Sequence, residues 1–115
     1  MSDSYEYPTD EELKRVHDFE LSDKFGNLPE FVQFIQSIWW APDWGFKYTR
    51  EKGCLELHTG GWSGNESIIE ALHGTWFWFW FWAKSVRGGH FWFELYQFNE
   101  DGTQKKNPEI KLREW

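Results

Sequence analysis

Trp76 to Trp82 reads WFWFWFW, seven aromatic residues in a row, and this stretch decides the fold that the sequence predicts. Its alternation of two residue types predicts an extended strand, in which successive side chains point to opposite faces of a sheet. Both faces are aromatic, so the strand should lie inside a sheet, because a flat apolar edge invites aggregation. Lys84 and Arg87, just beyond the run, can act as charged gatekeepers.

The patterns on either side of this run predict an α+β fold. Thr9 and Glu12 have the spacing of a capping box, and apolar residues at helical spacing follow them. From Trp44 onward the apolar period changes to two, which is typical of strands. We therefore predict the order α-α-β-β-α-β-β, with an antiparallel-rich four-stranded sheet and helices covering one face. The expected helices are 10–20, 29–39 and 66–73, and the expected strands are 44–49, 54–59, 76–82 and 90–98.

Length and composition favour one domain over residues 9–102. A chain of 115 residues can close one hydrophobic core. We expect a disordered acidic N-terminus over 1–8 and a charged C-terminal tail over 103–115, with a short edge strand at 110–113. The tail and the N-terminus are polar, whereas the aromatic residues between them can supply most of the folding energy.

Charge and cysteine content limit the classes of partner. The net charge is −7, and residues 1–30 hold nine acidic and three basic residues, a net of −6. No cluster of Lys and Arg offers a nucleic-acid surface, whereas an acidic N-terminus suits a basic protein partner. The single cysteine excludes an internal disulfide framework, and the longest apolar run is too short to span a membrane. We expect a cytoplasmic protein that binds neither nucleic acid nor membrane.

The aromatic run has three interpretations. Its tryptophan face can be packed in the core, can form a dimer or partner interface, or can stack on a base or a sugar. Four exposed indoles at roughly 150–250 Å² each would exceed the patch that a monomer normally leaves in water. Since the chain has few helices with which to cover two sheet faces, we predict a homodimer.

A polar aromatic face is expected on the sheet. Period-two alternation places Glu56 and His58 on one face of the second strand, and His90, Trp92, Glu94 and Tyr96 on one face of the fourth. Two imidazoles and two carboxylates have the chemistry of metal ligands or of general acids and bases. The helical His-Glu pair of a zincin is missing, so we predict no metal and no cofactor. The candidate residues of a wet binding face are Glu56, His58, Trp92, Glu94 and Tyr96.

Two glycine-rich loops form a second candidate site. Residues 58–66 lead into a helix, where free backbone N–H groups can hold an anion. The loop lacks the Lys and Ser/Thr of a Walker motif, and glycines that serve tight turns explain it equally. If the second and third strands run parallel, this loop meets the turn at 87–90. The candidate ligand-binding residues for a small anion or nucleotide are Trp62, Ser63, Asn65, Arg87 and His90.

No candidate nucleophile in the sequence has an identifiable catalytic base. Cys54 begins a strand without an evident partner, and Ser63, like Asn65, is explained as a cap of the following helix. We therefore assign no catalytic residue and expect a non-enzymatic protein. A small-ligand binding protein or hydrolase that uses the 58–66 loop, Arg87 and His90 is the alternative.

The segments HTGGWSGNESIIE (58–70) and RGGHFWFE (87–94) resemble a family of small uncharacterised proteins of bacteria and their phages. The resemblance covers roughly the second half of the chain. That family has no assigned activity, so no residue role is carried over. The resemblance implies a phage or prophage origin, and small acidic proteins of such origin often act as inhibitors. We therefore expect a binding protein that occludes or sequesters a host or competitor component.

Overall fold

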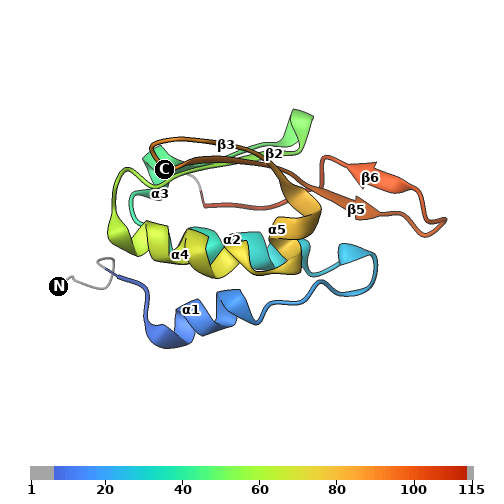
Figure 1. Ribbon diagram of the computed structural model, residues 1–115. Helices are drawn as coiled ribbons and strands as arrows, with labels where there is room; N and C mark the ends of the chain where they lie inside the picture. Colours follow the sequence, from blue (N-terminus) through green and yellow to red (C-terminus); the bar gives the residue numbers. More distant parts are fainter. Residues whose placement is uncertain (1–6, 114–115) are drawn as a thin grey trace.

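The computed structural model describes residues 7–113 and has the α+β fold that the sequence predicts. Its main sheet is antiparallel and has four strands in the order β1-β2-β4-β3 (Figure 1). A second sheet pairs β5 with β6 and projects from one end of the molecule. The strands are β1 Phe46–Thr49, β2 Cys54–His58, β3 Trp82–Val86, β4 His90–Glu94, β5 Tyr96–Phe98 and β6 Gln104–Lys106.

Helices α1, α2, α4 and α5 lie on one side of the main sheet, with α1 farthest from it, whereas α3 lies at the end of the sheet (Figure 1). The predicted capping box of α1 is confirmed, since Thr9 Oγ1 accepts from the Glu12 N–H and the Glu12 carboxylate accepts from the Thr9 N–H. The helices are α1 Asp10–His17, α2 Leu28–Ile38, α3 Pro42–Gly45, α4 Ser63–His73 and α5 Trp76–Phe81, with the 3-10 turns η2 Asp23–Phe25 and η3 Arg50–Lys52.

The aromatic run is a helix, so the prediction of an interior strand at 76–82 is wrong. Thr75 caps α5 by accepting the Trp78 N–H. Phe77 and Phe81, four residues apart and each 1% exposed, point from α5 into the core. Only Trp82 joins a strand, and that strand, β3, is an edge strand beside β4. The reason is that an unbroken aromatic run fits a period of 2 and a period of 3.6 equally well.

Three smaller predictions also change. The expected strand at 44–49 begins only at Phe46, because residues 42–45 form α3. The expected strand at 90–98 is interrupted at Leu95, where β5 leaves the main sheet to pair with β6. The tail has no strand at 110–113; instead the carbonyl oxygens of Lys111 and Arg113 accept hydrogen bonds from Gln33 and Gln36 of α2.

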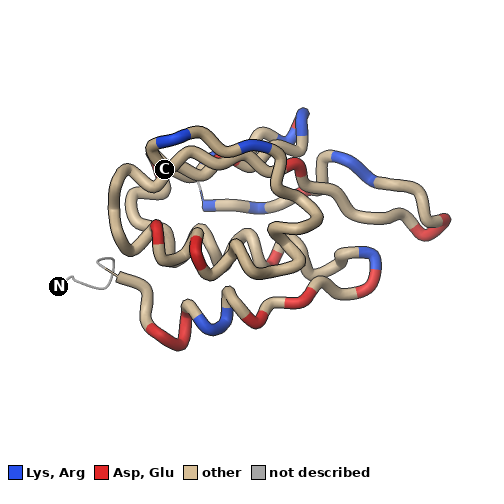
Figure 2. The backbone as a smooth tube through the Cα atoms, in the orientation of Figure 1, with Lys and Arg blue, Asp and Glu red and all other residues tan. Residues whose placement is uncertain are grey.

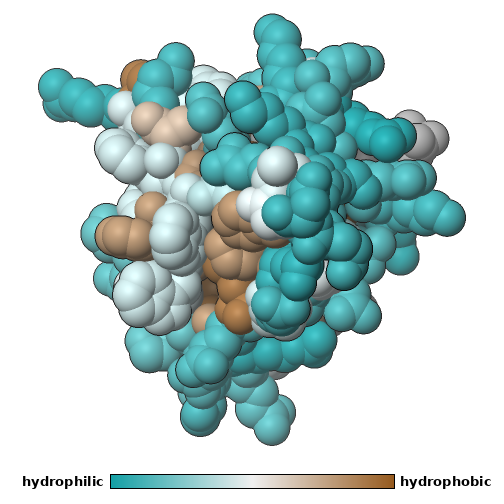
Figure 3. Space-filling view, turned by 90° about the vertical axis from the view of Figure 1, so that its right-hand side faces the viewer, coloured by the Kyte–Doolittle hydropathy of each residue, from teal (hydrophilic) through white to brown (hydrophobic). Residues whose placement is uncertain are grey.

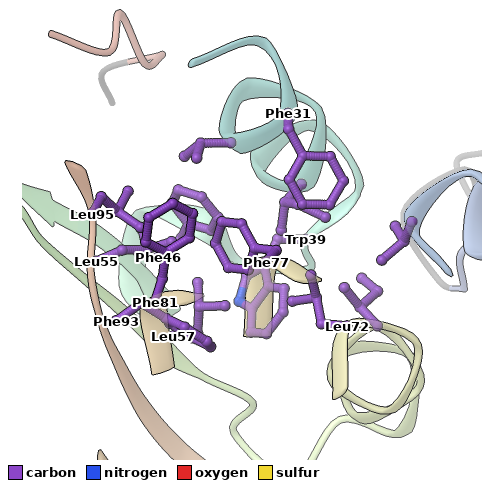
Figure 4. Close-up of a cluster of buried hydrophobic side chains, with 14 of the residues drawn as sticks. Phe31, Trp39, Phe46, Leu55, Leu57, Leu72, Phe77, Phe81, Phe93 and Leu95 are labelled. Atoms are coloured by element: carbon purple, nitrogen blue, oxygen red, sulfur yellow. The ribbon is translucent and has the colours of Figure 1, made fainter. Parts of the chain in front are cut away.

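The hydrophobic core fills the space between the sheet and the helices (Figure 4). Leu55 and Leu57 of β2 lie opposite Phe93 and Phe91 of β4, so these apolar side chains share the face that turns toward α5. Phe77 packs edge-on against Phe81 and tilted against Phe93, at centroid distances of 5.2 and 5.3 Å. Each fully buried side chain of this size stabilises the fold by about 1.5–3 kcal/mol.

The acidic N-terminal segment is part of this packing where the structure describes it. Val16 of α1 is fully buried, and Phe19 stacks on Phe31 of α2 at a centroid distance of 3.6 Å. Residues 1–6 of the predicted disordered segment lie outside the described residues. The acidic segment therefore contributes core contacts as well as negative charge.

Candidate functional site

The face of the main sheet opposite the helices is open, since no helix or strand of the described residues lies over it (Figure 1). The β2–β4 register sets Glu56 against Trp92 and His58 against His90. All four side chains are half-buried, and Glu94, opposite Cys54, is exposed. Two imidazoles, two carboxylates and an indole thus share one face.

Tyr96 does not belong to this face. The interruption at Leu95 turns β5 away from the sheet, and the Tyr96 ring packs edge-on against Phe81 at 5.1 Å and tilted against Phe25 at 5.7 Å. Both partners belong to the helix side of the molecule. Simple alternation along 90–98 placed Tyr96 with Trp92 because it assumed an uninterrupted strand.

His58 and His90 form a hydrogen-bonded pair at one end of the open face. Their Nδ1 atoms are 2.8 Å apart, so the N–H of one ring donates a hydrogen bond to the unprotonated nitrogen of the other. His58 Nε2 also lies 3.4 Å from a carboxylate oxygen of Glu56, a longer and weaker contact.

Aromatic and cationic groups flank the histidine pair. The Lys84 ammonium lies 4.4 Å above the Trp92 ring, a cation–π contact that draws Lys84 across the open face. Trp92 meets His58 edge-on at 5.8 Å, and Trp44, an exposed residue of α3, lies 6.1 Å from His58. The face is therefore an aromatic strip with an ammonium on each side, Lys84 of β3 against Trp92 and Lys47 of β1 opposite Glu56.

The two glycine-rich loops meet at one end of the sheet. β2 and β3 are both antiparallel to β4 and therefore run in the same direction, although β4 separates them. The Thr59 N–H donates to the Gly89 carbonyl at 2.9 Å. A side chain at residue 89 would place its Cβ only 2.0 Å from Thr59 Oγ1, and the φ of +86° there is also unfavourable for other residues. Gly89 is thus required for this approach.

The side chains of the first loop are engaged within the protein. Trp62 stacks on Trp40 at 4.9 Å and on Tyr7 at 5.0 Å, so its ring already has two aromatic partners within the protein. Ser63 does not cap α4 with its side chain; its hydroxyl donates to the Tyr7 hydroxyl.

Asn65 is 1% exposed and connects three parts of the fold. Its Oδ1 accepts the Trp40 N–H at 2.9 Å, and its Nδ2 donates to the Trp40 carbonyl at 3.1 Å and to the Thr59 carbonyl at 3.4 Å. It lies in the first turn of α4 and does not cap the helix. The end of α2, the end of β2 and the start of α4 are therefore joined through one amide.

Arg87 and Cys54 differ in accessibility. Arg87 is exposed in the turn between β3 and β4 and makes no ion pair with another described residue.

Cys54, by contrast, is half-buried. Burial, followed by the nearby Glu56 and Glu94 carboxylates, raises the pKa of the Cys54 thiol. A thiol in this setting stays protonated at neutral pH, which disfavours nucleophilic chemistry. Among residues 7–113, no three His, Cys, Asp or Glu side chains are placed to hold a metal ion.

Four large aromatic side chains at α5 and the start of β3 are exposed to solvent, and this surface was not predicted from the sequence. Trp76, Phe79 and Trp80 of α5, with Trp82 at the start of β3, are 58, 67, 47 and 46% exposed. We call these four residues the α5 aromatic surface. Trp76 meets Phe79 edge-on at 5.3 Å, and Phe79 meets Trp80 at the same distance. The i, i+3, i+4 spacing of the run, read as a helix, would have revealed this surface.

Comparison with known proteins adds no relative: no family model, no curated protein and no solved structure matches the chain. Within the described residues, no helix is both long and apolar enough to cross a membrane. The open sheet face and the α5 aromatic surface are therefore the two candidate functional surfaces of the described residues.

Proposed function

We propose that this protein is a non-enzymatic binding protein and that the α5 aromatic surface is its contact with a protein partner. The observation that carries the proposal is the exposure of four large aromatic side chains on one short helix and the strand that follows it. Contiguous exposed apolar side chains of this size mark interaction sites, and Trp is enriched among the residues that dominate binding energy.

The size of the surface fits the centre of an interface. Aromatic side chains of roughly 150–250 Å² that are about half exposed supply on the order of 400 Å² together. A stable interface buries about 800 Å² on each partner. The α5 aromatic surface would thus form about half of the contact, with a polar rim supplying the rest.

The small-ligand alternative at the two glycine-rich loops has less support. Trp62 is already stacked on two aromatic side chains, and the Asn65 amide is fully used in holding the fold together. Arg87 and His90 remain available, but the sheet face beside them is open, whereas small-molecule sites are concave. We propose instead that the protein acts by covering a surface of its partner, as an inhibitor of bacteriophage or prophage origin would.

The test compares two variants with matched exposed aromatic residues. Trp76→Ser/Phe79→Ser removes the most exposed part of the α5 aromatic surface, and Trp44→Ser removes an equally exposed indole at α3. Each protein is used to capture partners from a bacterial lysate, and every captured protein is purified and titrated by calorimetry. We expect a partner that binds wild type and Trp44→Ser alike and binds the double variant at least tenfold more weakly. Equal binding by all three proteins would refute the proposal.

Self-association on the same surface is the remaining possibility. Sedimentation velocity of the wild type at micromolar concentration measures it directly, because a dimer has twice the monomer mass of 14.0 kDa. A dimer that the double variant dissociates, with no heterologous partner captured, would assign the α5 aromatic surface to a homodimer instead.

A further inference from the structure

A groove lies beside the α5 aromatic surface, between the junction of α5 and β3 and the β5–β6 hairpin. Its volume is about 600 Å³, within the 300–1,000 Å³ range of sites that enclose a ligand or side chain. Buried Phe81 and Leu95 contribute to its lining, together with exposed Trp80 and Trp82. Figure 3 shows this end of the molecule, with hydrophobic residues gathered at the centre and hydrophilic residues around them.

The groove is bordered by cations in an otherwise acidic protein. Lys52 of η3 and Lys106 of β6 line it, and Lys105 is the neighbour of Lys106 in β6 (Figure 2). Neither Lys52 nor Lys106 forms an ion pair with another described residue. Glu94 is the one carboxylate in the lining, so the two lysines leave a local net charge of +1. The whole chain carries −7.

From this geometry we infer the chemistry of the partner, an inference that rests on the proposed function. The groove binds an extended acidic segment of the partner that inserts one aromatic side chain between Trp80 and Trp82. Carboxylates on either side of the inserted residue pair with Lys52 and Lys106. An aromatic side chain is preferred to an aliphatic one because the indoles can contact it edge-to-face.

A second copy of the chain suits the groove less well. A two-fold interface that includes the groove sets the same patch against itself, so the positively charged lining of one groove would face the same lining in the other copy. Two chains of net charge −7 would also repel each other. An acidic segment of a different protein avoids the repulsion between like charges at the groove, because its charge is opposite to that of the groove.

The test uses ¹⁵N-labelled protein and three short peptides: a tryptophan between four glutamates, an alanine between four glutamates, and a tryptophan between four lysines. We expect the first peptide to shift the indole N–H signals of Trp80 and Trp82 in saturable fashion, leaving the Trp44 signal in place. The other two peptides should bind at least tenfold more weakly. No saturable shift at millimolar peptide, or equal affinity for the acidic and basic tryptophan peptides, would overturn the inference.

Charge reversal gives a second test. Both lysines are exposed, so Lys52→Glu/Lys106→Glu should fold as the wild type does, and it should prefer the basic tryptophan peptide. An unchanged preference for the acidic peptide would contradict the assignment of these lysines. If the double variant still binds a partner that Trp76→Ser/Phe79→Ser loses, the protein-binding function stands and only the acidic-segment inference fails.

Discussion

Replacing Asn65 by Ala should destabilise the fold strongly, although the sequence presents this residue as a candidate ligand-binding group. The substitution removes the partners of the Trp40 N–H and the Trp40 carbonyl, at 2.9 and 3.1 Å, and a longer contact to Thr59 at 3.4 Å. A buried polar group left without a partner costs about 1–3 kcal/mol. Counting the two shorter bonds only, at about 1–2 kcal/mol each in the lower part of that range, we expect a loss of roughly 2–4 kcal/mol in the free energy of unfolding.

For a domain of this size, such a loss corresponds to a fall in Tm of roughly 8–15 °C. Circular dichroism with urea unfolding measures the change in free energy, and Asn99→Ala supplies the control. Asn99 also donates its amide to a side chain, Thr103 Oγ1 at 3.0 Å, but it does so in an exposed turn. The control should therefore lose about 0.5 kcal/mol or less. If Asn65→Ala proves as stable as this control, Asn65 is not the structural connection described here, and its role as a ligand-binding residue is open again.

Three further predictions concern α5, Tyr48 and Cys54. Phe77→Ala should cost about 3–5 kcal/mol, whereas Phe79→Ala should change stability by about 0.5 kcal/mol or less; similar losses in urea unfolding would contradict the helical α5. Burial raises the pKa of Tyr48 to about 12 from 10.0, and its hydroxyl donates to the Pro108 carbonyl. The unfolded chain therefore loses this proton first, and stability should fall from about pH 10 toward pH 12; Tyr48→Phe should flatten that part of the profile, and an identical slope would refute the assignment. Because the pKa of Cys54 is raised, its reaction with a thiol reagent at pH 7 should be slower than that of the urea-unfolded chain, and an equal rate would show a reactive thiolate.

Elements whose two faces differ chemically could be predicted from the sequence. Leu55 and Leu57 alternate with Glu56 and His58, so the strand and its buried face both follow from the pattern. The capping box of Thr9 and Glu12 likewise located the start of α1. In each case the spacing of the polar residues indicates the period of the element, because these residues lie on the side that faces water.

The aromatic run has no such marker, and this is why its structure was mispredicted. The decisive residue lies just before it: Thr75 caps a helix, and Phe77 and Phe81 then share one face. The contacts of Trp62 and Asn65 could not be predicted either, because their partners Tyr7 and Trp40 are 55 and 25 residues away in sequence. Glycine-rich loops suggested a ligand site, but here they allow close approach between segments of the chain itself.

The helical state of Trp76–Phe81 also has a consequence for unfolding. Six residues are too few to hold a helix in water by themselves, so α5 persists only while the Thr75 cap and the packing of Phe77 and Phe81 persist. Once these contacts are lost, the uncharged aromatic segment can adopt an extended conformation, which pairs readily with copies of itself. Heating should therefore end in aggregation, and the yield on cooling should fall as the protein concentration rises. The residues proposed to recognise a partner are then the same residues that make the unfolded chain insoluble.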